Sequence, residues 1–217
     1  SIIESVENNS VGTNYSTFYD TNNILSKLCE KHGTDKGYIE FEKETPYGWR
    51  PHSYSIYYNA LFSHCRKDIK LILECGIGSN NLDVESNMTT KGKPGASLRV
   101  WKEYFDNAQI IGADIDKRIL FQEDRISTYE VNQLDPSSIK NMWSKIKHNN
   151  FDIIIDDGLH TLEAGLTFFL NSFEKLKEGG IYLIEDVDFS YLNELKDKLI
   201  KYNPEVVILN NNYSNKS

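Results

Sequence analysis

The segment LILECGIGS, residues 71–79, decides the fold of this chain. Its apolar run is typical of a strand of a parallel sheet that is covered on both faces. Glu74 lies at the end of this strand, and Gly76 and Gly78 then let the backbone turn tightly and approach a ligand closely. Because open α/β sheets bind ligands at the carboxyl ends of their strands, the segment predicts a nucleoside-cofactor site.

The composition excludes several classes of protein. The 217 residues are enough for one domain with a core that needs no disulfides. A net charge of −8 argues against a nucleic-acid partner. No apolar run approaches the length of a membrane span, and the N-terminus has no signal-peptide pattern. Cys29, Cys65 and Cys75 lie far apart without metal-binding spacing, which indicates reduced cysteines in a cytoplasmic protein.

The order of predicted elements indicates an α/β fold. Strands alternate with helices from Lys70 onward, which is typical of a Rossmann-like, mostly parallel sheet with helices on both faces. We expect a polar, non-periodic N-terminal arm over residues 1–20 and a single domain over residues 21–217. Within that domain, residues 21–67 form a helical lead-in and residues 68–217 form the Rossmann-like core. Homo-oligomer formation is left open.

Local patterns give the expected elements. A helix over residues 22–32 ends at Gly33, and residues 80–93 form a polar insertion of the kind that is usually a functional lid or disordered. The spacing predicts a helix over residues 53–67 whose buried side carries Ile56, Tyr57, Ala60, Leu61 and His64. Asp135 and Pro136 are the cap and first residue of a later helix. Further strands are expected at 109–116, 127–133, 151–155, 181–184 after a Gly179-Gly180 turn, and 205–209.

Four successive strands end in carboxylates, which a parallel sheet brings to one edge. Each acid alone is explained about as well by helix capping, but the full set is not, because clustered carboxylates repel one another unless a cation lies among them. The sequence therefore predicts an acidic rim. Its members are Glu74, Asp114, Asp156, Asp157, Glu185 and Asp186.

The spacing favours a nucleoside without a pyrophosphate. Asp114, at the end of the second strand, is placed to accept hydrogen bonds from ribose hydroxyls. It follows the glycines at a greater distance than in dinucleotide sites, and the third glycine of the dinucleotide pattern is absent after Gly78. The glycine pair alone is a weak signal, and Asp114 strengthens it.

The later acids predict a metal site and a base. Asp157, Glu185 and Asp186 offer hard oxygen ligands, which suit Mg²⁺ or a similar divalent cation. His160 follows Asp157 by three residues at the start of a helix. A histidine near its ordinary pKa of ~6.5 accepts a proton from a hydroxyl at physiological pH. The alternative is that His160 only caps or packs the helix start.

Several segments carry a family resemblance. ECGIG (74–78), GASLRVW (95–101) and GADID (112–116) resemble class I S-adenosylmethionine-dependent methyltransferases. DIIIDDGLH (152–160) and GGIYLIED (179–186) narrow the resemblance to the metal-dependent sugar O-methyltransferases of macrolide tailoring. HGTDKG (32–37) also matches, so a segment that its spacing describes as a helix end and loop is expected to face the cofactor or substrate.

The resemblance implies S-adenosylmethionine and Mg²⁺ as cofactors and a small sugar or glycan precursor as acceptor. It also implies a closing antiparallel hairpin, whose second strand we expect to be missing or truncated after residues 205–209. The implied cofactor-binding residues are Lys36, Glu74, Gly76, Gly78, Ser97, Asp114, Gln133 near the adenine, and Asp156 near the methionyl amine. The implied metal ligands are Asp157, Glu185 and Asp186, with Asp157 and His160 as catalytic residues and His160 as the base.

Two other functions are compatible with the same sheet. One is an NAD(P)-dependent sugar oxidoreductase or epimerase, although no Tyr-x-x-x-Lys helix stands in the expected place. The other is a non-catalytic cofactor-binding subunit that contributes a sheet edge to a partner.

Overall fold

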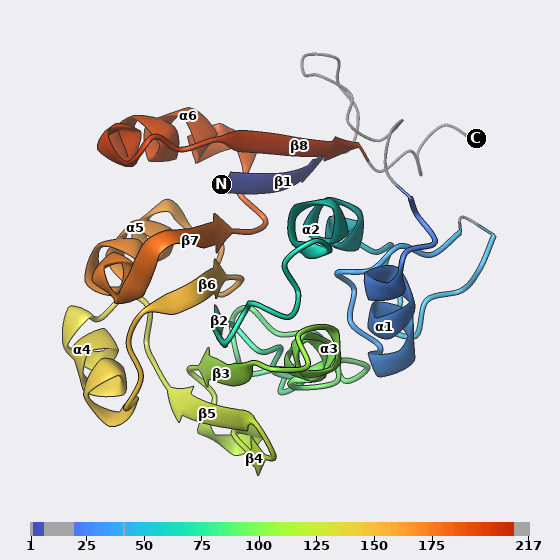
Figure 1. Cartoon of the computed structure of the whole chain (residues 1–217), viewed down its shortest axis with the longest axis horizontal. Coiled ribbons are helices and arrows are strands. Elements are labelled where there is room, and N and C mark those ends of the chain that lie inside the picture. Colours follow the sequence, from blue (N-terminus) through green and yellow to red (C-terminus); the bar gives the residue numbers. More distant parts are fainter. Residues whose placement is uncertain (1, 7–19, 41, 211–217) are drawn as a thin grey trace.

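The computed structural model describes residues 2–6, 20–40 and 42–210 and contains one eight-stranded sheet (Figure 1). The strands lie in the order β4-β5-β3-β2-β6-β7-β1-β8. Among these residues every pairing is parallel except that of β4 with β5. The strands are β1 (Ile2–Val6), β2 (Leu71–Cys75), β3 (Gln109–Asp114), β4 (Gln122–Glu123), β5 (Ile126–Glu130), β6 (Phe151–Asp156), β7 (Leu176–Ile184) and β8 (Val206–Asn210).

Helices cover both faces of the sheet, as the alternating pattern predicts (Figure 1). One face carries α1 (Ile24–His32), α2 (Tyr54–Phe62) and α3 (Ala96–Tyr104), and the other carries α4 (Pro136–Lys145), α5 (Leu162–Ser172) and α6 (Phe189–Lys198). Three short 3₁₀ helices complete the described elements: η2 (Lys117–Ile119), η3 (Phe173–Lys175) and η4 (Ile200–Tyr202). None of the described helices combines the length and apolar composition that crossing a membrane requires. The expected Rossmann-like fold class is confirmed.

The sheet separates two apolar cores because neighbouring side chains on a strand point to opposite faces. In β2, Ile72 packs in the core under α1, α2 and α3, whereas Leu71 and Leu73 pack in the core under α4, α5 and α6. All five residues of β2 are buried, as its continuous apolar run predicts.

The position of β2 creates the binding crevice. β2 pairs with β3 on one side and with β6 on the other, so the direction of chain progression reverses at this strand. In open parallel sheets ligands bind at such a switch point, beyond the carboxyl ends of the strands. The residues that follow β2, β3, β6 and β7 therefore surround one space.

The predicted end of α1 at Gly33 and the predicted start of α4 at Asp135 and Pro136 are confirmed. The side chain of Asn23 accepts a hydrogen bond from the backbone N–H of Ser26 at the start of α1, and Gly33 ends that helix with φ of 79°. Asp135 caps α4 in the same way, with Pro136 as the first helical residue. Capping side chains satisfy N–H groups that have no partner within the helix.

The edge of the sheet differs from the prediction. Residues 2–6, assigned above to a non-periodic arm, form β1, which lies between β7 and β8 and is parallel to both. The strand expected at 205–209 is present as β8, but it pairs in parallel with β1. Residues 211–217, where we expected no closing antiparallel strand, lie outside the described residues. The division into an arm and a single domain stays a prediction.

Two local predictions are wrong. The Gly179-Gly180 turn is instead part of the long strand β7, whose register against β6 shifts between Phe151 and Ile153. Helix α2 ends at Phe62, and its buried face carries Tyr54, Ser55, Ile56, Tyr58 and Phe62, while Ala60 and His64 are exposed. The helix is apolar nearly all round, so its periodicity does not distinguish the two faces.

A buried carboxylate connects the starts of the central strands and gives a first prediction. Asp152 of β6 accepts hydrogen bonds from the backbone N–H groups of Lys70 and Leu71, at 2.8 and 2.9 Å, and pairs with Lys177. Asp152→Ala leaves two N–H groups without these partners, so we expect a loss of about 3 kcal/mol in the free energy of unfolding, measured with urea. Asp124→Ala, at an exposed carboxylate, is the control and should change it by less than about 0.5 kcal/mol. Equal effects of the two substitutions would contradict this role of Asp152.

Candidate active site

A cavity of about 680 Å³ opens at the carboxyl ends of β2, β3 and β6. Cavities of this size hold drug-sized ligands. Ten of the predicted site residues line it: Lys36, Glu74, Gly76, Gly78, Ser97, Asp114, Gln133, Asp157, His160 and Asp186. The other two, Asp156 and Glu185, line a second space of about 10 Å³, together with His160 and Tyr191. The sheet therefore brings the predicted residues to one region.

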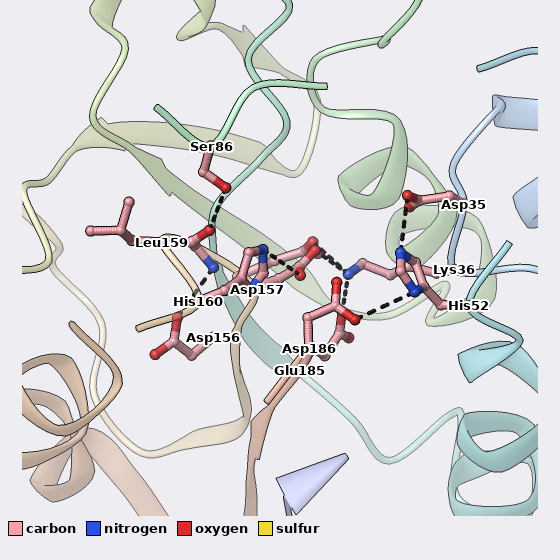
Figure 2. Close-up of polar contacts among 12 residues, drawn as sticks. Asp35, Lys36, His52, Ser86, Asp156, Asp157, Leu159, His160, Glu185 and Asp186 are labelled. Carbon is pink, nitrogen blue, oxygen red and sulfur yellow. Dashed lines mark hydrogen bonds and ion pairs between the residues drawn. The ribbon is translucent and has the colours of Figure 1, made fainter. Parts of the chain in front are cut away.

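Lys36 places a positive charge among the clustered carboxylates. Its Nζ lies 2.6 Å from Asp157 Oδ2 and 3.5 Å from Glu74 Oε1, and it also donates to Glu185 Oε2 (Figure 2). Burial alone lowers the pKa of Lys36, but the three carboxylates more than offset this and raise the pKa well above its ordinary value. Lys36 therefore carries a charge although its side chain is only 3% exposed.

Glu185 is enclosed by hydrogen-bond donors. Its Oε2 accepts from Lys36 and its Oε1 accepts from the hydroxyl of Tyr58 in α2. Burial raises the pKa of Glu185 well above its ordinary value, against the lowering effect of Lys36. Both carboxylate oxygens thus have partners within the protein.

Asp186 contacts a tyrosine and a histidine through one oxygen of its carboxylate. The Tyr54 hydroxyl donates to Asp186 Oδ1, and His52 Nδ1 lies 3.4 Å from the same oxygen. His52 Nε2 lies 3.4 Å from Asp35 Oδ2, so the imidazole stands between two carboxylates (Figure 2). Burial lowers the pKa of His52, but its contacts with Asp35 and Asp186 raise it to about 9. His52 is therefore an imidazolium at neutral pH.

Asp157, His160 and Asp186 form a group with the arrangement of a metal site. One ligand atom of each lies within 4.8 Å of those of the other two, and all three side chains are partly exposed to the cavity. His160 Nε2 is 3.8 Å from Asp157 Oδ1. Two carboxylates beside an imidazole accept a divalent cation, and oxygen ligands favour Mg²⁺.

The glycine turn after β2 packs directly against the loop after β6. Gly76 has φ of 85°, and a Cβ at this position would lie 2.0 Å from the carbonyl oxygen of Asp157. The backbone N–H of Ile77 donates to Asp114 Oδ2 at 2.9 Å, which fastens the same turn to the end of β3. Gly76 therefore lets the loop that carries Asp157 approach β2.

Asp116, which was not among the predicted residues, extends the site beyond Asp114. Both oxygens of Asp114 accept backbone hydrogen bonds, one from Ile77 and the other from Asp116. The Asp116 carboxylate accepts from Ser79 Oγ at 2.6 Å, from Asn81 Nδ2 at 2.7 Å and from Arg118. Asp114 thus shapes the glycine turn, whereas Asp116 fastens the segment that follows it.

Gln133 and Asp156 are bonded to each other beside the β6 loop. Gln133 Nε2 donates to Asp156 Oδ1 at 2.6 Å, and Gln133 Oε1 accepts from the N–H of Leu159. A Cβ on Gly158 would lie 1.8 Å from Gln133 Oε1, so the glycine makes room for this side chain. Burial raises the pKa of Asp156 to about 6, partly offset by the hydrogen bond from Gln133. Its Oδ2 is buried without a hydrogen-bond partner in the described part of the chain.

Glu74 is held by α3, the helix that follows the insertion. Its Oε1 accepts from Ser97 Oγ at 2.8 Å, and its Oε2 accepts from the indole N–H of Trp101. Ser97 and Glu74, both predicted to contact a cofactor, are thus bonded to each other at the cavity wall. The carboxylate orients the end of β2 relative to the start of α3.

The insertion over residues 80–93 covers the glycine turn, as expected of a lid. The N–H of Met88 donates to the carbonyl of Ser79 at 2.6 Å, and Ser86 Oγ donates to the carbonyl of Gly158 at 3.0 Å (Figure 2). On the other side, Arg118 bonds both Asp83 and Asp116. Its residues 83–89 and 93 line the cavity. The insertion therefore forms part of the cavity wall.

Several site residues were missed by the sequence analysis: Asp35, His52, Tyr54, Tyr58, Trp101 and Asp116. Tyr54 and Tyr58 are spaced four apart, so they share a helix face, and both hydroxyls reach carboxylates of the rim. The four-residue spacing of the two tyrosines could have indicated their shared role. The sequence analysis missed it because it assigned the buried side of this helix to other residues. His52 belongs to an irregular loop whose conformation no local pattern indicates.

Comparison with known proteins points to one class of enzyme. No family model matches the chain. The 8-demethyl-8-alpha-L-rhamnosyl tetracenomycin-C 2'-O-methyltransferase of Streptomyces olivaceus is 31% identical over 167 residues, 77% of this chain and 38% of that enzyme. Demethylmacrocin O-methyltransferase of Streptomyces fradiae is 33% identical over 147 residues, 68% of this chain and 35% of that enzyme.

A solved structure agrees with the sequence comparison. MycE methyltransferase from the mycinamycin biosynthetic pathway, in complex with Mg, SAH and mycinamycin VI, matches with a TM-score of 0.60 and 29% identity, over 79% of this chain and 41% of that one. This chain has the fold of the sugar O-methyltransferases. The predicted resemblance is confirmed. This chain spans less than half the length of these relatives.

The contact of Gly76 with the β6 loop gives a second prediction. Gly76→Ala places a methyl group on the Asp157 carbonyl in addition to the backbone strain at positive φ, so we expect a loss of at least about 3 kcal/mol in unfolding free energy. Gly179→Ala is the matched control, because Gly179 has φ of 73° but nothing within 4 Å of an added Cβ. It should cost only about 1–2 kcal/mol by chemical denaturation. A Gly76→Ala protein as stable as the control would show that the two loops do not need this close approach.

Proposed function

We propose that this chain is the cofactor- and metal-binding part of an S-adenosylmethionine-dependent O-methyltransferase. The observation that carries the proposal is that one cavity joins the glycine turn of β2 to the Asp157, His160 and Asp186 group. The relatives support it: they are named O-methyltransferases, and the MycE structure contains Mg and SAH.

The cavity suits the cofactor. We propose that Glu74, Gly76, Gly78, Ser97 and Asp156 surround its amino-acid end and that Asp114 and Gln133 lie beside its nucleoside, with Asp116 added at the ribose end. The carboxylates of the rim that line the cavity, among them Glu74, Asp114 and Asp157, complement the positive charges of a sulfonium and an amine. S-adenosylmethionine supplies a methyl group on a positively charged sulfur. The insertion over residues 80–93 reduces the access of water, a competing acceptor, to this space.

We propose that Asp157, Glu185 and Asp186 hold a divalent cation, as the sequence analysis predicts. A bound divalent cation supplies positive charge that favours the ionised form of a hydroxyl. Asp157 and Asp186 face the cavity with His160, whereas Glu185 already accepts hydrogen bonds from Lys36 and Tyr58. We therefore expect Asp186→Asn to weaken cation binding more than Glu185→Gln does.

His160 is the proposed proton acceptor. Its imidazole lies at the cavity wall, with Nε2 3.8 Å from Asp157 Oδ1. In the proposed reaction His160 takes the proton of the acceptor hydroxyl while that oxygen forms a bond to the methyl carbon. The methyl–sulfur bond breaks, and its electron pair stays on the sulfur of the leaving S-adenosylhomocysteine. General-base catalysis of this kind contributes roughly 10²- to 10⁴-fold in rate.

The acceptor that we propose is a sugar hydroxyl of a glycan precursor or a glycosylated natural product. Its support is that the relatives are named for methylation of rhamnosyl tetracenomycin and demethylmacrocin. We propose a cytoplasmic location from the three separated cysteines, none of which forms a disulfide. Whether the protein acts as a homo-oligomer belongs to the same set of proposals and awaits measurement of its mass in solution.

Removal of the metal tests the function directly. Calorimetry with S-adenosylhomocysteine should show binding with or without EDTA, whereas release of S-adenosylhomocysteine from S-adenosylmethionine with a panel of methyl glycosides should stop in EDTA and return with excess Mg²⁺. His160→Gln should lower kcat by about 10²-fold or more and leave cofactor affinity within about threefold. Lack of any cofactor binding by the wild-type chain would refute the proposal, and unchanged turnover of His160→Gln would refute the assignment of the base.

A further inference from the structure

Two residues of the group formed by Asp157, His160 and Asp186 have a strained backbone. His160 has φ of 56° and Asp186 has φ of 51°, in the left-handed region. A non-glycine residue there costs of the order of 1–3 kcal/mol, so the conformation persists only where the surroundings hold it. Asp157, the third member, is not among the described residues with positive φ. Neighbouring groups must therefore hold His160 and Asp186 in these conformations.

At Asp186 the holding group is the hydroxyl of Tyr54. This hydroxyl accepts a hydrogen bond from the backbone N–H of Asp186 at 3.2 Å and donates one to Oδ1 of the same residue. The two bonds fix both the peptide and the carboxylate. Tyr54 itself is 1% exposed and stacks on His52, with ring centroids 5.2 Å apart and an interplanar angle of 10°.

At His160 the holding group is the hydroxyl of Tyr191. It donates to the carbonyl oxygen of His160 at 2.9 Å. Tyr191 belongs to the first turn of α6, whose N-terminus is capped by Asp188. On the next residue, Thr161, the side chain caps α5 by accepting from the N–H of Ala164. The strained residue thus lies between a helix cap and a tyrosine tether.

The two tyrosines act from opposite sides of the sheet. α2, which begins with Tyr54, lies on one face, and α6, which carries Tyr191, lies on the other (Figure 1). Their hydroxyls meet two loops that follow neighbouring strands, β6 and β7. Both tethered side chains, His160 and Asp186, converge with Asp157 (Figure 2).

We infer that Tyr54 and Tyr191 are positioning residues, which hold Asp186 and His160 in left-handed conformations that direct their side chains toward Asp157. The inference rests on the proposed function, because it assigns the tethers to the metal ligand and the proton acceptor. Neither hydroxyl needs to touch a cofactor or substrate for this role. Phenylalanine at either position keeps the ring and removes only the tether.

The test uses three Tyr→Phe variants. Tyr54→Phe should weaken Mn²⁺ affinity, measured by electron paramagnetic resonance with S-adenosylhomocysteine present, by about tenfold or more. Tyr191→Phe should lower kcat by about tenfold or more and leave the acceptor KM within about twofold. Tyr104→Phe is the matched control, because its hydroxyl bonds Asn59 at 3.0 Å and it is not among the residues that line the cavity. It should change neither quantity.

The outcomes separate this inference from the proposed function. Wild-type chain that binds neither Mn²⁺ nor S-adenosylhomocysteine would remove the proposed function. Wild-type chain that binds both, with Tyr54→Phe and Tyr191→Phe indistinguishable from Tyr104→Phe in Mn²⁺ affinity and kcat, would overturn the tethers alone. A purely structural role would lower the melting temperature of the variants without these changes, and this too would overturn the inference. If Tyr54→Phe does not fold, Tyr191→Phe still tests the inference. A lower kcat with an unchanged acceptor KM would support the positioning role, and an unchanged kcat would overturn it.

Discussion

The buried ammonium of Lys36 forms ion pairs that connect the segment before α2 to the ends of three strands of the sheet. Lys36 reaches from the segment before α2 to Glu74 at the end of β2, to Asp157 after β6 and to Glu185 after β7. Three carboxylates this close repel one another, and burial adds to the cost of ionising them. The Lys36 charge opposes both effects, although burial still raises the pKa of Glu74 and Glu185 above their ordinary values. An acidic rim that would otherwise oppose folding thereby becomes a contact between the helical lead-in and the sheet.

Three residues near the acidic rim have left-handed backbone conformations: Gly76, His160 and Asp186. Glycine takes the left-handed turn at Gly76, where the backbone of the next loop leaves no room for a side chain. At His160 and Asp186 the same left-handed conformation occurs with a side chain that lines the cavity, and hydrogen bonds with neighbouring residues hold the strained backbone instead. Glycine therefore occurs where no side chain fits, and a residue held by hydrogen bonds occurs where a side chain lines the cavity.

The parts of the fold that could be predicted are those that depend on neighbours in the sequence. The apolar run of β2, the cap at Asp135 and the acids at strand ends are local, and the parallel sheet then brings those acids together. The partners of the acids could not be predicted, because Tyr54 and Asp186 are 132 residues apart and no periodicity links them. β1 was missed for a related reason: its place depends on pairing with β7 and β8, which the polar stretch around it does not indicate.

The division of work among the elements follows from their place in the sheet. The turns after β2 and β3 are fixed by backbone hydrogen bonds to Asp114. The loops after β6 and β7 are instead fixed through side chains from α2, α6 and Lys36. These side-chain contacts leave Asp157, Asp186 and His160 partly exposed to the cavity. In the proposed function, the turns bonded through the backbone hold the methyl donor and the loops bonded through side chains face the acceptor, so that the two reactants are held close together and oriented.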